Sequence, residues 1–135
     1  MAKFKKINHI AIAVSDIEGA VTFWRDTLGI PFSHVEDVPS QKAKVAFFPV
    51  GDSEIELVMP TADDTGTARF LAKNGPGMHH LCLEVDHIEE KLLELKQKNV
   101  QLINETPLVL EGRKMAFLHP KSTQGVLIEL YEITN

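Results

Sequence analysis

The sequence predicts an α+β fold made of two βαβββ modules, and three observations lead to this prediction. Short segments alternate polar and apolar residues with period two, as strands do, and two longer segments carry apolar residues at helical spacing. The order of these segments in the first half is found again in the second half, about 71 positions later. The chain has 135 residues, enough for one domain built from two small modules with a shared core.

The first module is expected over about residues 5–60. It begins with a strand at 7–14, in which small or polar residues alternate with aliphatic ones. Ser15, as N-cap, and Glu18 have the spacing of a capping box, so a helix should begin there and end at Gly29. The remaining strands of this module are expected at 32–38, 43–50 and 53–59.

A linker is expected over residues 61–76, with a short helix at 67–73, and the second module over about 77–134. The strand 79–85 opens this module, and Asp86 is expected to be the N-cap of the helix that follows. Apolar residues at helical spacing support that helix, and they match those of the first module. The remaining strands are expected at 100–103, 113–119 and 126–132.

Composition and charge exclude several classes of protein. The net charge is −5 and the lysines are scattered, so the sequence has no basic stripe that could bind the phosphate backbone of a nucleic acid. No apolar run approaches the ~20 residues that a membrane span requires. Cys82 is the single cysteine and cannot form an internal disulfide, which fits a small core residue in a reducing compartment. We therefore expect a cytoplasmic protein with no nucleic-acid or membrane partner.

The internal repeat pairs chemically useful residues with one another. His9 matches His80, and Glu56 matches Glu129. Each histidine lies near the start of the first strand of its module, and each glutamate lies between aliphatic residues in the last strand, where a lone buried carboxylate would be costly. Two imidazoles and two carboxylates suit a divalent transition metal with positions left for water or substrate. His79 points to the opposite face from its neighbour and is expected to play a supporting role.

Paired modules that each supply a histidine and a glutamate resemble the vicinal oxygen chelate superfamily, over nearly the whole chain. Within that superfamily, the details resemble the methylmalonyl-CoA epimerases. The segment Asn-His-Ile-Ala-Ile-Ala-Val is common across the superfamily, whereas the others are more specific to the epimerases. The segments that carry the resemblance are residues 8–14, 70–80, 119–122 and 125–130.

The resemblance implies a metal site and an assembly. It implies that His9, His80 and Glu129 bind a divalent metal and that Glu56 is the fourth ligand. Cobalt is the first choice of metal, with manganese, nickel or zinc as alternatives. It also implies curved mixed sheets that enclose the metal, and a homodimer.

The resemblance further implies that an acyl-CoA is the substrate, and that the R and S forms of methylmalonyl-CoA are interconverted by α-proton abstraction through a metal-stabilised enolate. Glu129 is the leading base. Some epimerases appear to use a glutamate on the third strand, but residues 44–48 carry no carboxylate here, which leaves Glu56, a water molecule or Gln41 as the opposite acid. The candidate contacts for the substrate carboxylate or the CoA phosphates are Ser40, Gln41, Arg113, Lys114 and Lys121.

Three alternatives remain open. A lactoylglutathione lyase uses a similar metal site for proton transfer in an enediolate. A non-catalytic small-molecule-binding member of the superfamily would tolerate an incomplete set of metal ligands, whereas this chain retains all four. An extradiol dioxygenase needs two histidines and one glutamate around iron, which Glu56 as a fourth ligand disfavours.

Overall fold

The computed structural model describes all residues, 1–135, and the chain divides into two compact units. The N-terminal unit comprises His9–His79, and the C-terminal unit comprises Met1–Asn8 together with His80–Asn135. The boundary between them falls inside two strands, so the first strand contributes residues to both units. None of the helices is long and apolar enough to span a membrane.

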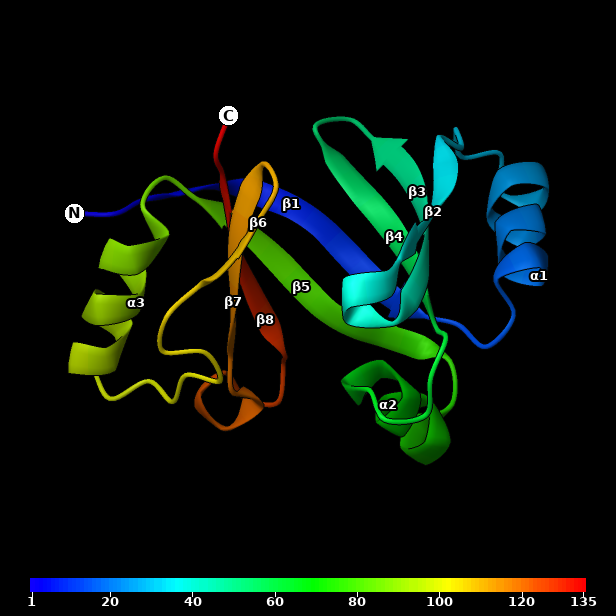
Figure 1. The fold of residues 1–135 in the computed structure, drawn as a ribbon. Coiled ribbons are helices and arrows are strands. Elements are labelled where there is room, and N and C mark those ends of the chain that lie inside the picture. Colours follow the sequence, from blue (N-terminus) through cyan, green and yellow to red (C-terminus); the bar gives the residue numbers. More distant parts are fainter. The chain divides into compact units, whose positions relative to one another are not determined.

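The N-terminal unit has the predicted order of strand, helix and three strands (Figure 1). Its sheet has the order β2-β3-β4-β1, in which β1 runs parallel to β4 and the other neighbours are antiparallel. A helical turn, η1, continues α1. The elements are β1 (Phe4–Ala13), α1 (Ile17–Thr22), η1 (Phe23–Thr27), β2 (His34–Val38), η2 (Pro39–Gln41), β3 (Ala43–Val50), β4 (Ser53–Pro60) and α2 (Gly66–Asn74).

The C-terminal unit repeats this arrangement with the order β5-β8-β7-β6. Here β5 runs parallel to β8, and β7 is antiparallel to both of its neighbours. Both units therefore place the first strand of the module beside the last, which confirms the two βαβββ modules. The elements are β5 (Gly77–Val85), α3 (Ile88–Gln97), β6 (Leu108–Leu110), β7 (Arg113–Leu118), η3 (Pro120–Ser122) and β8 (Ile128–Ile133).

The two hydrophobic cores correspond residue by residue. Each core joins one helix to one face of its sheet, and Figure 1 shows α1 and α3 each beside the strands of their own unit. The other face of each sheet is left without a helix of that module, so polar side chains can be presented there. The core of the N-terminal unit consists of Val14, Ile17, Val21, Ala46, Phe48 and Leu57, and its counterparts are Val85, Ile88, Leu92, Ala116, Leu118 and Leu130.

The N-cap residues predicted for the two long helices were wrong. Asp16, rather than Ser15, caps α1, because its carboxylate Oδ1 accepts a hydrogen bond from the Gly19 N–H at 3.3 Å. The regular α-helix ends at Thr22, and the helical turn η1 then leads to Gly29, whose φ of +77° ends the helical region as predicted.

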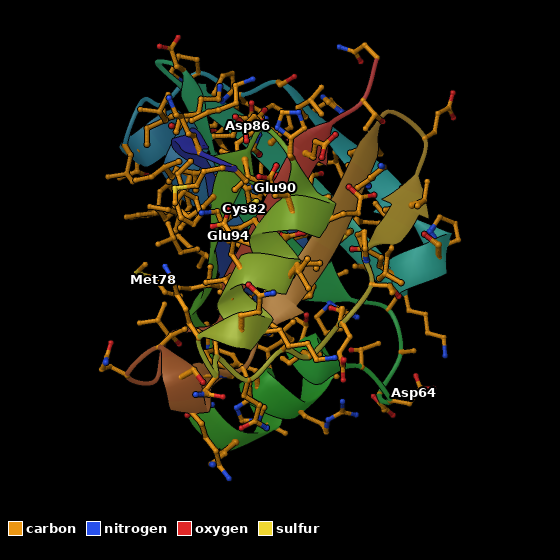
Figure 2. All side chains as sticks on the ribbon, turned by 90° about the vertical axis from the view of Figure 1, so that its left-hand side faces the viewer. Asp64, Met78, Cys82, Asp86, Glu90 and Glu94 are labelled. Carbon is orange, nitrogen blue, oxygen red and sulfur yellow. The ribbon has the colours of Figure 1, made fainter.

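The start of α3 is bound by a side chain from a distant strand. Glu132 on β8 accepts a hydrogen bond from the Ile88 N–H at 2.7 Å, whereas Asp86 accepts one from the Lys3 N–H at 2.8 Å. The bond from the Lys3 N–H lowers the pKa of Asp86 below its usual range. Figure 2 labels Asp86 just before α3, and Glu90 and Glu94 on that helix. Asp86 is therefore not the N-cap: it holds the N-terminal segment of the chain.

We expect Glu132→Ala to destabilise the protein by about 2 kcal/mol, because the buried Ile88 N–H would lose the carboxylate that accepts its hydrogen bond. Thermal unfolding should show a decrease in Tm of roughly 6 °C. Glu132→Gln is the matched control, since its amide oxygen can still accept this bond. An equal loss of stability in both variants would contradict the capping role.

One predicted strand was wrong, the strand expected at 43–50 has its predicted bounds, and the others were confirmed with shifted ends. Residues 100–103 form no strand; only an isolated bridge between Leu102 and Leu118 occurs there, and β6 lies later in the chain. The strand expected at 32–38 begins at His34, and the one expected at 126–132 runs from Ile128 to Ile133.

Candidate functional site

In the N-terminal unit, His9 and Glu56 lie side by side on the face of the sheet opposite α1. Ala11 pairs in register with Glu56 across the parallel strands β1 and β4, and His9 points to the same face two residues earlier. The Nδ1 atom of His9 is 3.1 Å from the Oε2 atom of Glu56. His9 is only 3% exposed, so this pair is shielded from bulk water.

The C-terminal unit contains the equivalent pair. Cys82 pairs in register with Glu129 across β5 and β8, as Ala11 does with Glu56, and His80 lies two residues before it. The Nε2 atom of His80 is 3.0 Å from the Oε1 atom of Glu129, which is itself 3% exposed. The Phe117 ring lies edge-on to the His80 ring at 5.5 Å and restricts its orientation.

The geometry of each pair fits two ligands of one cation. Two donor atoms about 2.1 Å from an octahedral metal, at a right angle to one another, lie about 3 Å apart. The measured separations are 3.1 Å for His9–Glu56 and 3.0 Å for His80–Glu129. Imidazole nitrogen and carboxylate oxygen together suit divalent first-row metals. The residues of each unit therefore fit half of the predicted metal site.

His79 differs from its neighbour, as predicted. It belongs to the N-terminal unit, where its ring meets that of Phe70 on α2 edge-on at 5.2 Å. This contact gives His79 a packing role beside α2.

Two of the predicted substrate contacts lie in the N-terminal unit. Ser40 and Gln41 occupy the turn η2 and are exposed. The next residue, Lys42, has a φ of 51° and pairs through its Nζ atom with Asp64 at 2.8 Å. The turn that carries Ser40 and Gln41 is thereby attached to the loop before α2.

Arg113 and Lys114 are adjacent on β7 and therefore point to opposite faces. Arg113 shares the face of Glu129 and lies over the Tyr131 ring at 5.8 Å, and its Nε atom is buried without a hydrogen-bond partner. Lys114 lies on the helix-covered face, with its Nζ atom 2.7 Å from the Glu89 carboxylate. This hydrogen bond raises the pKa of Lys114 and lowers the pKa of Glu89. The structure thus gives Lys114 a role in attaching α3 to the sheet.

Lys121 lies in η3, directly after β7, and its side chain is exposed. Its backbone N–H donates to the Nδ1 atom of His119 at 3.1 Å, so His119 caps this turn.

Sequence reasoning missed one polar contact close to these residues. The Asn8 amide donates to the buried Glu84 carboxylate at 3.0 Å in the C-terminal unit. The only signal in the sequence was a carboxylate at an otherwise apolar end of a strand, and its partner lies 76 positions away.

Comparisons with known proteins place these observations in a family. Residues 8–117 match the model of the Glyoxalase/Bleomycin resistance protein/Dioxygenase superfamily. The mitochondrial methylmalonyl-CoA epimerase of Mus musculus is 41% identical over 130 residues, which cover 95% of this chain and 73% of that protein. The ethylmalonyl-CoA/methylmalonyl-CoA epimerase of Cereibacter sphaeroides is 35% identical over 131 residues, which cover 95% of this chain and 98% of that protein.

A solved structure extends the comparison to the fold. The Streptomyces coelicolor methylmalonyl-CoA epimerase in complex with 2-nitronate-propionyl-CoA matches with a TM-score of 0.89 at 30% sequence identity. The match covers 98% of this chain and 100% of that chain. The fold class predicted from the sequence is confirmed.

Proposed function

Because the chain belongs to the Glyoxalase/Bleomycin resistance protein/Dioxygenase superfamily and, within it, to the methylmalonyl-CoA epimerases, an isomerase family, we propose that it interconverts the R and S forms of methylmalonyl-CoA. The observation that carries this proposal is the His–Glu pair that each unit holds at equivalent positions of its sheet. A carboxylate in a shielded position can serve as the acid or base of a proton transfer, and each pair supplies one.

We propose that His9, Glu56, His80 and Glu129 bind one divalent cation, cobalt first, with manganese, nickel and zinc as alternatives. The donor–donor distance within each pair and the nitrogen and oxygen ligand types support this assignment. When bound, the cation would stabilise the negative charge that develops on the substrate oxygens as the α-proton leaves.

Glu129 is proposed as the base that removes the α-proton of the substrate. This proton is acidic because its carbon lies between a carboxylate and a thioester carbonyl. The burial of Glu129 keeps bulk water away from the carboxylate while it holds the proton. Return of a proton to the opposite face inverts the carbon. The N-terminal unit offers Glu56 for that step, with Gln41 or a water molecule as the alternative.

The remaining proposed contacts of the substrate lie on different elements, and Arg113 shares a sheet face with Glu129. Phe117 lies opposite Glu129, and Arg113 lies four residues further along β7, about 13 Å away at ~3.3 Å per residue. This separation is between strand positions, and the long Arg113 side chain can shorten it, so we propose Arg113 as a contact of the malonyl carboxylate or of a CoA phosphate. Its buried Nε atom without a hydrogen-bond partner supports an anionic ligand. Ser40, Gln41 and Lys121 remain proposed contacts of the substrate, whereas Lys114 is already bound to Glu89.

We also propose that the protein acts as a homodimer in the cytoplasm. The family relation supports the dimer, and a single cysteine without a disulfide fits a reducing compartment. Light scattering should give the mass of two 15.1 kDa chains.

The function is tested by hydrogen exchange. The protein is stripped of metal with a chelator, reconstituted with cobalt, and incubated with each epimer of methylmalonyl-CoA in D₂O, and NMR measures loss of the α-proton and formation of the other epimer. We expect both with cobalt and neither with chelator. Turnover of the methylglyoxal–glutathione hemithioacetal without α-proton exchange would instead establish a lactoylglutathione lyase. A reproducible failure to take up any metal would favour a binding protein.

A further inference from the structure

Glu84 is a buried carboxylate that the proposed reaction does not use. It lies on β5, on the same side of the strand as His80 and Cys82, and is only 5% exposed. The equivalent position in the first module, 71 residues earlier, is Ala13, which is fully buried. The carboxylate is therefore an addition to the C-terminal unit, and the repeated fold does not require it.

A buried carboxylate is costly unless it is hydrogen-bonded or paired. Glu84 has two partners within its unit: the Asn8 amide at 3.0 Å and the Lys5 ammonium at 3.4 Å. Lys5 is about half exposed, so water and salt screen its attraction. The contact with Asn8 is a direct hydrogen bond in a partly buried position, and it is the more specific of the two.

Asn8 is the residue directly before His9. Successive side chains of a strand point to opposite faces, so the direction of one fixes the direction of the next. A strand that rotated or slipped by one residue at this point would turn His9 away from Glu56. The pairing of β1 with β4 from His9 onward opposes such a slip, and the bond from Asn8 to Glu84 adds to it directly before His9, because it holds the Asn8 side chain beside Glu84.

We propose that Glu84 and Asn8 are positioning residues for His9, and that they set the affinity of the protein for its divalent cation. This inference rests on the proposed metal site. Glu84 does not touch the cation; it acts through the backbone of β1. Residues that support metal ligands typically contribute a factor of ~10 to 100 in affinity, and an effect through the backbone should lie near 10.

The test measures cobalt binding by visible absorption and calorimetry in the full-length protein. Asn8→Ala and Glu84→Ala are each expected to weaken cobalt binding about 10-fold and to shift the cobalt absorption bands. Glu84→Gln keeps an acceptor for Asn8 and loses the pairing with Lys5, so it should bind cobalt within about twofold of the unmodified protein. Lys5→Met should do the same. The Tm of each metal-free variant separates a loss of fold from a loss of positioning.

The outcomes separate a failure of the positioning role from a failure of the proposed metal site. Weaker binding in Asn8→Ala, with rescue in Glu84→Gln, supports the positioning role. If the unmodified protein binds cobalt, His9→Ala abolishes binding, and both alanine variants at 8 and 84 bind normally, the positioning role is overturned and the metal site stands. If His9→Ala binds cobalt as the unmodified protein does, the proposed metal site itself fails.

Discussion

Replacing Glu129 with glutamine is expected to lower the rate of epimerisation by about 10³-fold, within the range that a positioned base contributes. Glutamine has nearly the same shape and keeps an oxygen for the His80 ring at the position where the carboxylate lies 3.0 Å away. It cannot accept a proton. The α-proton exchange of each epimer is measured separately by NMR in D₂O, because removal of one base should block abstraction from one epimer more than from the other.

Glu132→Gln is the control on the same strand. Its side chain lies on the helix-covered face, where it binds the Ile88 N–H, so this variant should epimerise at an unchanged rate. The cobalt content of both variants is determined, since Glu129 is also a proposed ligand. A Glu129→Gln variant that loads cobalt and epimerises within tenfold of the normal rate would rule out Glu129 as the base.

Replacing His80 with alanine is expected to weaken metal binding by much more than ~100-fold and to remove measurable turnover. A residue that only supports a metal ligand contributes at most ~100-fold to metal affinity. The ring lies against Glu129 and Phe117, so its loss also leaves the carboxylate without its neighbour. Metal content after dialysis against cobalt is the direct measurement, and circular dichroism checks that the strands are retained.

His79→Ala is the matched control, because it removes the same side chain one residue earlier. His79 packs on Phe70 and should affect cobalt affinity by less than about tenfold. Equal losses in the two variants would contradict the assignment of His80 as the ligand.

The His–Glu pairs could be predicted from the sequence because two regularities coincide. Alternation in a strand fixes which residues share a face, and the repeat then identifies which of two adjacent histidines matters. The equivalent registers, Ala11 with Glu56 and Cys82 with Glu129, show why the repeat was informative: it preserves strand pairing as well as residue type. That both pairs bind one cation stays a prediction.

Contacts between distant segments could not be predicted in this way. The carboxylate that accepts the first N–H of α3 belongs to Glu132, 44 positions after the helix start. The local sequence does not show that Glu132, rather than Asp86, plays this part. The partner of Glu84 is equally remote. The false strand at 100–103 had the right composition, but only Leu102 forms a bridge there. Alternation along β7 places Lys114 and Arg113 on opposite faces, but nothing in the local sequence identifies Glu89, 25 positions away, as the partner of Lys114.

The division of the chain has a consequence for any attempt to separate the two modules. The polypeptide passes from one unit to the other between Asn8 and His9 and again between His79 and His80, two points that the repeat makes equivalent. A cut in the linker would yield two polypeptides that each carry a strand segment belonging to the other's unit. Neither polypeptide alone would therefore contain all the residues of one unit.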